Sequence, residues 1–426
     1  ANGDVYEGGA SGLSRHGVGT CWFANGDVYA GAWADDAQHG AGTMRWVALG
    51  REYAGQWEAG CMGGLGVLTL TRTGDALDGW FDAGGARGHC RLTTRSGVTI
   101  EGSFEGMRLG GRATLSATSG ERYDGHMRVE LGGEGATWAR HGEGEARTRG
   151  GERLVGVFVD DALVGRGARY GPAGDAYVGE FRGGEPHGHG VLRTAALDEY
   201  EGEWSGGKRH GDGTQRLGAT GDVLVGTWEN DGLAGRGTQR CGSGERYDGD
   251  FAGSARDGRG VCAYADGARY VGEWRAGLRE GRGRLAGPDD ALIAEGTWAR
   301  GELEGPGARR DPDGGVYVGQ FARGMAHGRG RHEYADGATY EGEWADGRRH
   351  GDGAYRGADG AAADGAWRSG RLHGRARRVD ADGGVYEGEF EAGKPGGADP
   401  VLLPTLQELL GAWRAQLARL RPAAAG

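Results

Sequence analysis

The segment Tyr340-Glu341-Gly342-Glu343-Trp344, followed by His350-Gly351-Asp352-Gly353, decides the fold of this chain. Its Tyr, Gly and Trp stand at positions i, i+2 and i+4. Side chains alternate between the two faces of a β-strand with a period of two residues, so these three lie on one face of a strand; a helical period of 3.6 residues would not align them. The segment therefore predicts a strand with an aromatic face, and His-Gly-x-Gly predicts a second strand.

The same pattern recurs along the chain in 17 copies, separated by eleven intervals of 23 residues, four of 24 and one of 31. The middle glycine is present in every copy, from Gly8 to Gly388, and the next aromatic position is Trp or Phe in 15 copies, the exceptions being Ala10 and Met127. Self-similarity at a fixed period predicts a repeat array. The first positions of the copies are 6, 29, 53, 77, 100, 123, 154, 177, 200, 224, 247, 270, 294, 317, 340, 363 and 386.

Turn sequences separate the predicted strands. Asp346-Gly347 lies within a repeat, and Asn25-Gly26, Asp266-Gly267 and Asp336-Gly337 lie between repeats. Such pairs tolerate the positive φ of hairpin turns, so each repeat is predicted to be one β-hairpin. We expect an all-β fold, an elongated single-layer antiparallel meander of about 17 stacked hairpins, roughly 160 Å long at about 4.8 Å per strand. The strand-centre glycines are expected to leave room for an aromatic ring from an adjacent hairpin.

Composition restricts the class of protein. The 96 glycines and few large aliphatic residues do not suit an ordinary core, and the 13 Trp and 15 Tyr do not suit a disordered chain. A net charge of -11 argues against unaided binding to nucleic acid or anionic lipid. The five cysteines lack C-x-x-C spacing and are expected to be reduced thiols of an intracellular protein. We expect no membrane-spanning segment, and the start within a repeat leaves open whether the chain is part of a longer protein.

The last segment departs from the repeat. We predict a repeat array over residues 1–397, with an insertion around 129–140, and a linker and helix over 398–426. Thr405-Leu406-Gln407-Glu408 has the pattern of a capping box, and Leu406, Leu409, Leu410, Trp413, Leu417 and Leu420 follow at helical spacing. This amphipathic helix is expected either to cap the last hairpin or to dock another subunit. The second interpretation makes Leu409, Trp413 and Leu417 candidate partner-binding residues.

The block Tyr340-Glu341-Gly342-Glu343-Trp344, with its His-Gly-x-Gly half, resembles the MORN repeat (membrane occupation and recognition nexus) over residues 6 to about 397. Proteins with such repeats include junctophilins, plant phosphatidylinositol phosphate kinases, alsin, a lysine methyltransferase, apicomplexan cytoskeletal organisers and ciliary radial-spoke head proteins. Copies that depart from the pattern have Leu77, Ile100, Leu154, Leu224, Ala294 or Ala363 at the first position. The eight-residue insertion is interpreted as a bulged loop or kink, or alternatively as a partner contact.

The aromatic stripe is the first candidate site. Its rings either pack only on neighbouring glycines or, since a single-layer sheet has no second layer to cover them, form an exposed groove for a partner helix or extended peptide. Under the second interpretation the candidate partner-binding residues are Tyr200, Trp204, Trp228, Tyr270, Trp274, Tyr340 and Trp344.

The opposite face of the strands has its own pattern. Positions one and three after the first Tyr position carry Asp or Glu in 16 of 34 places and never Lys or Arg, while basic residues collect in turns such as Lys208-Arg209 and Arg348-Arg349. We interpret this as an acidic solvated face, which either keeps the sheet soluble or steers basic partners.

The sequence predicts no catalytic, metal or cofactor site. Eight histidines, including His210 and His350, recur at one slot about 9.6 Å apart, too far to share one zinc ion, and are interpreted as turn-stabilising hydrogen-bonding groups. No phosphate loop, calcium loop or nucleophile-and-base motif is present. We therefore expect no enzyme and no cofactor.

The family resemblance implies a non-enzymatic scaffold and protein-interaction rail in a large intracellular assembly, cytoplasmic and either cytoskeletal or ciliary axonemal. The expected partners are other proteins of that assembly, with dimerisation of the chain left open and no nucleic acid. The alternatives are a phosphoinositide or membrane-contact module, which the acidic face disfavours, and the regulatory part of a longer enzyme.

Overall fold

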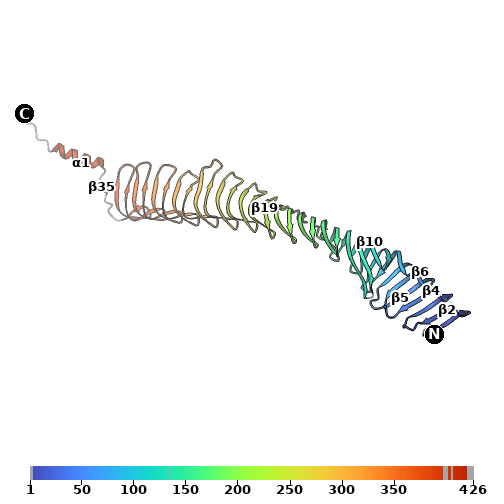
Figure 1. Cartoon of the computed structure of the whole chain (residues 1–426). Helices are drawn as coiled ribbons and strands as arrows, with labels where there is room; N and C mark the ends of the chain where they lie inside the picture. The colour runs from blue at the N-terminus through green and yellow to red at the C-terminus, as the bar shows by residue number, and fades with distance from the viewer. Residues whose placement is uncertain (1–2, 133, 397–401, 404–405, 420–426) are drawn as a thin grey trace, which may run out of the picture. The chain divides into compact units, whose positions relative to one another are not determined.

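The computed structural model describes residues 3–132, 134–396, 402–403 and 406–419. Two compact units comprise Ala1–Ala219 and Thr220–Gly426. Within each unit, strands consecutive in sequence pair antiparallel in an open single-layer meander, and Figure 1 shows the curved hairpins lying side by side. The described residues contain 17 consecutive hairpins, β1 to β34, and one helix. The prediction of an all-β hairpin meander with one helix is confirmed.

The strands of the first unit are β1 (Val5–Ser11), β2 (Ser14–Trp22), β3 (Val28–Ala34), β4 (Ala37–Trp46), β5 (Arg51–Glu58), β6 (Cys61–Leu70), β7 (Ala76–Asp82), β8 (Gly85–Thr93), β9 (Val98–Gly106), β10 (Arg108–Ala117), β11 (Arg122–Gly132), β12 (Gly135–Arg147), β13 (Arg153–Val159), β14 (Ala162–Tyr170), β15 (Ala176–Arg182), β16 (Glu185–Arg193), β17 (Glu199–Ser205) and β18 (Lys208–Arg216). The elements of the second unit are β19 (Val223–Glu229), β20 (Gly232–Arg240), β21 (Arg246–Ala252), β22 (Ala255–Ala263), β23 (Arg269–Arg275), β24 (Leu278–Ala286), β25 (Leu292–Ala299), β26 (Glu302–Arg310), β27 (Val316–Ala322), β28 (Met325–Glu333), β29 (Thr339–Ala345), β30 (Arg348–Arg356), β31 (Ala362–Arg368), β32 (Arg371–Val379), β33 (Val385–Glu391), β34 (Lys394–Pro395), β35 (Leu402–Leu403) and α1 (Leu406–Arg419).

Each hairpin bends at its central glycines. In β29 and β30, Gly342 pairs with Gly353, and the register then shifts between Gly342 and Glu343. Gly351 has a φ of 52°, in the left-handed region that favours glycine. A β-bulge of this kind bends the strand. Every hairpin therefore has two arms: we call the arm with the first Tyr position and the turn between repeats the turn arm, and the arm with the Trp and the hairpin tip the tip arm.

Where a repeat has Tyr at its first position, the ring lies across the glycines of its own hairpin. Tyr340 is fully buried, and a Cβ atom on Gly353 would lie 2.1 Å from its hydroxyl oxygen. That hydroxyl donates a hydrogen bond to the carbonyl of Glu343 at 3.1 Å. The glycines do make room for a ring, as expected, but the expectation that the ring comes from an adjacent hairpin is wrong for Tyr.

The Trp of each repeat joins its hairpin to the one before. Trp344 donates from Nε1 to the carbonyl of Gly330 on β28, at 3.1 Å. Its ring meets Tyr340 of its own hairpin and Tyr317 of the preceding one edge-to-face, both at 5.1 Å between centroids. Edge-to-face pairs contribute about 0.5–1.5 kcal/mol beyond the burial of area. The core of each unit is thus a row of Tyr and Trp or Phe rings, interrupted where Leu, Ile or Ala replaces Tyr.

Trp344→Phe tests this row. We expect a loss of about 1–2 kcal/mol in the stability of β28 to β30, since the Nε1 hydrogen bond disappears while a ring remains. Native-state hydrogen exchange of the amides in these strands measures the change. Trp80→Phe is the control, because Trp80 is 53% exposed; its effect is expected within about 0.5 kcal/mol. Equal effects of the two substitutions would contradict the joining role of Trp344.

Two further series of hydrogen bonds connect successive hairpins without using the rings. At the turns between repeats, an Asp carboxylate accepts from the backbone of the next such turn, as Asp175 does from Ala195 at 2.8 Å. At the hairpin tips, a backbone N–H donates to the preceding hairpin, as Gly347 does to the carbonyl of Ala326 at 2.9 Å. These bonds do not depend on Tyr, which explains how copies with Leu or Ala at the first position keep the hairpin form.

The predicted insertion lengthens a hairpin. Pairing between β11 and β12 continues out to Gly132 and Gly135, so the interpretation of residues 129–140 as a bulged loop is wrong. The inward-facing Val129 and Leu131 are each 3% exposed. Near the far end of this hairpin, the N–H of Ala136 donates to the carboxylate of Asp75 at 3.0 Å, in the turn between β6 and β7. The hairpin therefore crosses from its own tip arm to the turn arm of an earlier repeat.

At the end of the array, β35 completes the last hairpin. Leu403 pairs with Val385, and Leu402 pairs with Tyr386, at the beginning of β33. The strand β34 pairs with the end of β33 along the same edge. The predicted helix is present as α1, and its Leu410 and Trp413 are 43% and 63% exposed. The side chains of Leu409 and Leu417 lie outside the described residues. A short strand pairs with the last hairpin, while the described middle of α1 is exposed.

Candidate interaction surface

The aromatic residues singled out from the sequence are buried. Exposure is at most 8% for each of Tyr200, Trp204, Trp228, Tyr270, Trp274, Tyr340 and Trp344. The premise that these rings line an exposed groove is therefore wrong, because each ring packs between the glycines of its hairpin and the rings of its neighbours. Trp413 stands apart from them on α1. The role of these residues in partner binding stays a prediction.

Burial keeps the ring hydroxyls in their neutral form. It raises the pKa of Tyr177 and of Tyr317 to about 12, well above the ordinary value near 10. The hydroxyls therefore remain protonated and continue to donate their hydrogen bonds, at 3.0 Å from Tyr177 to Glu180 and 2.9 Å from Tyr317 to Gln320. These hydrogen bonds hold the bend in the strand.

A residue of the second strand covers the rings. It pairs with the Trp or Phe, as Arg349 pairs with Trp344 and Leu233 with Trp228. The guanidinium carbon of Arg349 lies 4.3 Å from the ring centroid of Trp367, and that of Arg279 lies 4.2 Å from Trp298. This position is Arg in six hairpins and Leu in five, and the two can replace each other because the stem of Arg covers apolar surface as Leu does. This exchange along the sequence was the signal that sequence reasoning missed.

The prediction that Arg209 and Arg349 belong with the surface charges of the turns is accordingly wrong. Arg209 lies 5.6 Å from the ring centroid of Tyr200, and Arg349 lies 5.7 Å from that of Tyr340. Cations over aromatic faces contribute roughly 0.5–2 kcal/mol, more where they are desolvated. These two arginines belong to the covering layer of the core, whereas their neighbours Lys208 and Arg348 are exposed.

Above this covering layer, the two arms of the hairpins enclose grooves in the second unit. One groove, of about 460 Å³, lies between turn-arm residues such as Asp336 and Ala361 and tip-arm residues such as Gly370 and Arg371. Arg349, Trp367 and the half-buried Tyr355 also line it. We call it the central groove. A second groove of about 480 Å³ has the same position in earlier repeats, with Asp266 on the turn arm, Leu278 on the tip arm and Arg279 among its lining residues.

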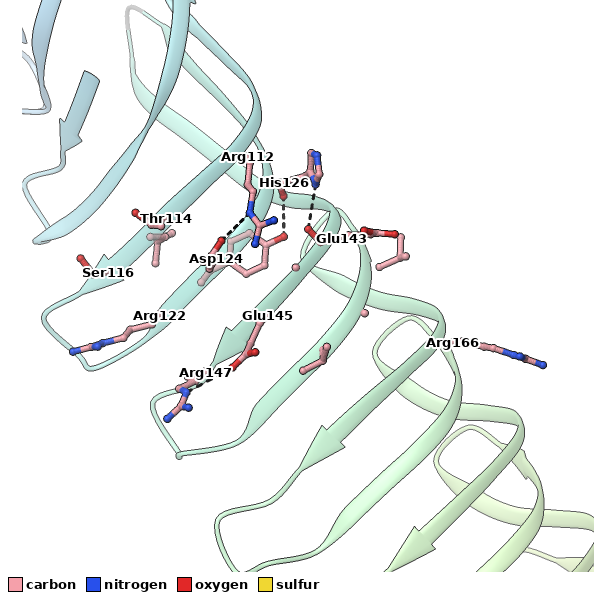
Figure 2. Close-up of a pocket in the computed structure, with 16 residues that line it drawn as sticks. Arg112, Thr114, Ser116, Arg122, Asp124, His126, Glu143, Glu145, Arg147 and Arg166 are labelled. Atoms are coloured by element: carbon pink, nitrogen blue, oxygen red, sulfur yellow. Dashed lines mark hydrogen bonds and ion pairs between the residues drawn. The ribbon is translucent and has the colours of Figure 1, made fainter. Parts of the chain in front are cut away.

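The opposite face of the sheet is mixed in charge, so the predicted acidic face is wrong in one respect. The middle residue of Gly-x-Gly lies on the same face as the acidic positions, and it is Arg in many repeats. Figure 2 shows labelled side chains of this face over β10 to β14. They line a hollow of about 1000 Å³. Arg112 pairs with Asp124 at 3.1 Å. Arg153 pairs with Glu145 at 2.7 Å, and this hydrogen bond holds the pKa of that carboxyl below its ordinary value.

The repeated histidines do not form a chemical centre. His210 and His350 stand exposed on this mixed face, and their backbone carbonyls lie 3.4 and 3.3 Å from the hydroxyls of Tyr200 and Tyr340. In the part of the chain that the structure describes, no three His, Cys, Asp or Glu side chains are grouped as metal ligands would be. No helix among the described residues is long and apolar enough to cross a membrane.

Several solved structures are similar to this chain at low sequence identity. The TCP domain of SAS-4 of Drosophila melanogaster, in complex with a proline-rich motif of Ana2, is similar at 10% identity and a TM-score of 0.20, covering 47% of this chain and 95% of that one. A streptogramin B lyase is similar at 12% identity and a TM-score of 0.13, covering 71% and 87%. Virginiamycin B lyase of Staphylococcus aureus gives 9% identity and a TM-score of 0.11, covering 80% and 96%. No curated protein matches this sequence.

The family comparison is specific. The MORN repeat matches twelve segments that together cover more than half of the chain, at residues 15–28, 29–48, 53–71, 177–195, 200–217, 247–269, 270–291, 295–316, 317–339, 340–362, 364–385 and 386–397. The hairpins of residues 72–176, which this family pattern does not match, have the same strand pairing and the same central bend. The chain belongs to the MORN repeat family.

Proposed function

We propose that this chain is a non-enzymatic structural scaffold that presents protein-binding surfaces in a large intracellular assembly, cytoskeletal or ciliary axonemal. MORN repeats indicate a repeat protein that interacts with proteins or membranes. The observation that carries the proposal is the central groove, an open channel between two arms over a floor whose own rings are already buried. Such a groove offers binding surface without any loss of core packing.

Charge supports protein partners over lipid. The net charge is -11, and basic and acidic residues alternate on the mixed face of the sheet. Binding to anionic membranes requires a cluster of basic side chains near the surface, worth about 1 kcal/mol for each residue. The exposed α1 residues Leu410 and Trp413 add a second candidate surface for a subunit of the same assembly.

The test expresses the tagged full chain in ciliated cells and extracts the membranes with detergent. We expect the chain to stay with the detergent-resistant axoneme or cytoskeleton. A deletion of residues 400–426 that remains folded is expected to lose part of this retention if α1 docks a subunit. Flotation with anionic vesicles at low and high salt is the counter-test: release by detergent together with strong, salt-sensitive flotation would replace the scaffold with the membrane-contact function.

A further inference from the structure

The last hairpins of the second unit carry opposite charges on the two sides of the central groove. On the turn arm, Asp336, Asp359 and Asp382 recur at intervals of 23 residues, one in each turn between repeats. On the tip arm, Arg348, Arg371 and Lys394 recur at the same interval. All six side chains are exposed. We call these the acidic rim and the basic rim.

The rim charges are available to a ligand. Each Asp of the acidic rim accepts one backbone hydrogen bond within its own turn through Oδ1, as Asp336 does from Ala338 at 2.9 Å. Acidic residues also occur at the tips, but Asp346 is paired with Arg323 of the preceding hairpin at 3.7 Å, and Glu391 stands opposite Lys394 in the last hairpin. Asp336 and Arg371 line the central groove on its two sides, and the other four rim residues take the equivalent places in neighbouring hairpins.

The spacing of the rims selects the conformation of a ligand. Two strands per repeat place successive rim charges about 9.6 Å apart. A polyproline II helix advances about 9.3 Å in each turn of three residues, so every third residue of such a ligand returns to the same side of the groove. An α-helix advancing about 9.6 Å turns through roughly 640°, so its facing side rotates by about 80° at each repeat and loses register.

The lining of the groove leads to the same ligand. Its half-buried Tyr334 and Tyr355, with Trp367, supply the aromatic lining on which proline-rich segments dock.

In the first unit, a segment of the chain occupies the corresponding space between the tip arm and the turn arm. The long hairpin of β11 and β12 crosses from tip arm to turn arm, buries Val129 and Leu131, and ends on a turn carboxylate, that of Asp75. An extended segment with apolar side chains facing inward is thus compatible with the space between the arms. In the second unit, the two grooves remain open at the equivalent place.

We propose that the central groove binds an extended, proline-containing peptide with a period of three residues: one apolar residue facing the aromatic lining, one basic residue facing the acidic rim and one acidic residue facing the basic rim. This inference rests on the proposed function and names the class of partner. The two rims also fix the direction of the peptide, because reversing a three-fold helix exchanges the sides on which its basic and acidic residues stand.

The test measures binding of a labelled peptide, made of three consecutive Pro-Lys-Glu triplets, to the full chain by fluorescence anisotropy at low salt. The control peptide has the same composition arranged in blocks, with all prolines first, then all lysines, then all glutamates, which removes the period. A peptide with Lys and Glu exchanged is not a control, because it binds in the opposite direction. We expect the periodic peptide to bind at least about tenfold more tightly than the blocked one, a difference of about 1.4 kcal/mol, with affinity falling as salt rises.

The matched protein variant is Asp336→Asn/Asp359→Asn/Asp382→Asn, since the amide oxygen of Asn preserves the hydrogen bond within each turn while the charge disappears. We expect the periodic peptide to bind this variant about tenfold more weakly, with an unchanged circular-dichroism spectrum. Equal binding of the two peptides, no binding of either, or tighter binding of a helical peptide of residues 406–419 would each overturn the inference. None of these results bears on axonemal retention, which tests the scaffold function separately.

Discussion

Replacing Gly353 by Ala is expected to lower the stability of the surrounding hairpins by about 3 kcal/mol or more. The added Cβ would lie 2.1 Å from the hydroxyl oxygen of Tyr340 and 2.4 Å from its ring carbon. Tyr340 is fully buried between Trp344 and Trp367, so its ring has no room to move aside. The change is measured by native-state hydrogen exchange of the amides in β28 to β32, because arrays of repeats open locally.

The chain itself contains the compensating change. In three of the six copies without Tyr, those with Leu77, Ile100 and Ala363, the residue opposite the central glycine is Cys90, Ala113 and Ala376, whereas the other three copies keep glycine there. Without a ring across the bend, a side chain fits there. The double variant Tyr340→Leu/Gly353→Ala is therefore expected to be more stable than Gly353→Ala alone.

A control separates this clash from the loss of a glycine as such. Gly110 lies in β10, and a Cβ atom there would meet no atom within 4 Å. Gly110→Ala is expected to change stability by no more than about 1 kcal/mol in either direction. If Gly353→Ala were as mild as Gly110→Ala, the ring of Tyr340 would not depend on bare backbone, and this account of the repeat would fail.

The period of the sequence was sufficient to predict the hairpins because it combines two local rules, alternation along a strand and turn residues at fixed places. It did not predict that the strands bend, since the bulge at Gly342 depends on pairing with a second strand. The error about exposed rings follows from this. A flat sheet would leave Trp344 open, whereas a bent hairpin encloses it with Tyr340 and Arg349.

The candidate surface was less predictable for the same reason. Asp336 and Arg371 are 35 residues apart and look like unrelated turn residues in the sequence. Only the bend brings the turns and the tips to opposite sides of one groove. Likewise, the long hairpin was recognised as an insertion, but its contact joins Ala136 to Asp75 across 61 residues, which no local pattern reports.

Replacing Asp75 by Ala is expected to release the long hairpin of β11 and β12. The carboxylate is 6% exposed and accepts from the backbone N–H groups of Ala136 at 3.0 Å and Arg95 at 3.2 Å, and from the hydroxyl of Thr73 at 3.0 Å. Hydrogen bonds to a charged group contribute about 1.5–3 kcal/mol each. We expect a loss of about 3 kcal/mol or more in the protection of the amides of residues 128–132 and 135–138 from hydrogen exchange.

The control for this variant is Asp175→Ala. Asp175 accepts the equivalent bond from the next turn, that of Ala195 at 2.8 Å, but its side chain is exposed and no long hairpin reaches it. Its loss is expected to cost no more than about 1.5 kcal/mol and to leave residues 128–138 protected. Unchanged exchange at the long hairpin in Asp75→Ala would show that Val129 and Leu131 alone hold it in place.

The same carboxylate gives the long hairpin a defined dependence on pH. Burial alone would raise the pKa of Asp75, but the hydrogen bonds from Ala136, Arg95 and Thr73 outweigh burial, and the pKa is lowered. A carboxyl whose pKa is lower in the folded state stabilises fully above its unfolded pKa, near 3.9, and this stabilisation disappears as pH falls through the folded value. The difference in protection between the wild-type chain and Asp75→Asn is therefore expected to be constant from about pH 8 to pH 5 and to shrink below about pH 4. A difference that instead grew on acidification would mean that the protonated carboxyl holds the hairpin, contrary to the contacts with three donors.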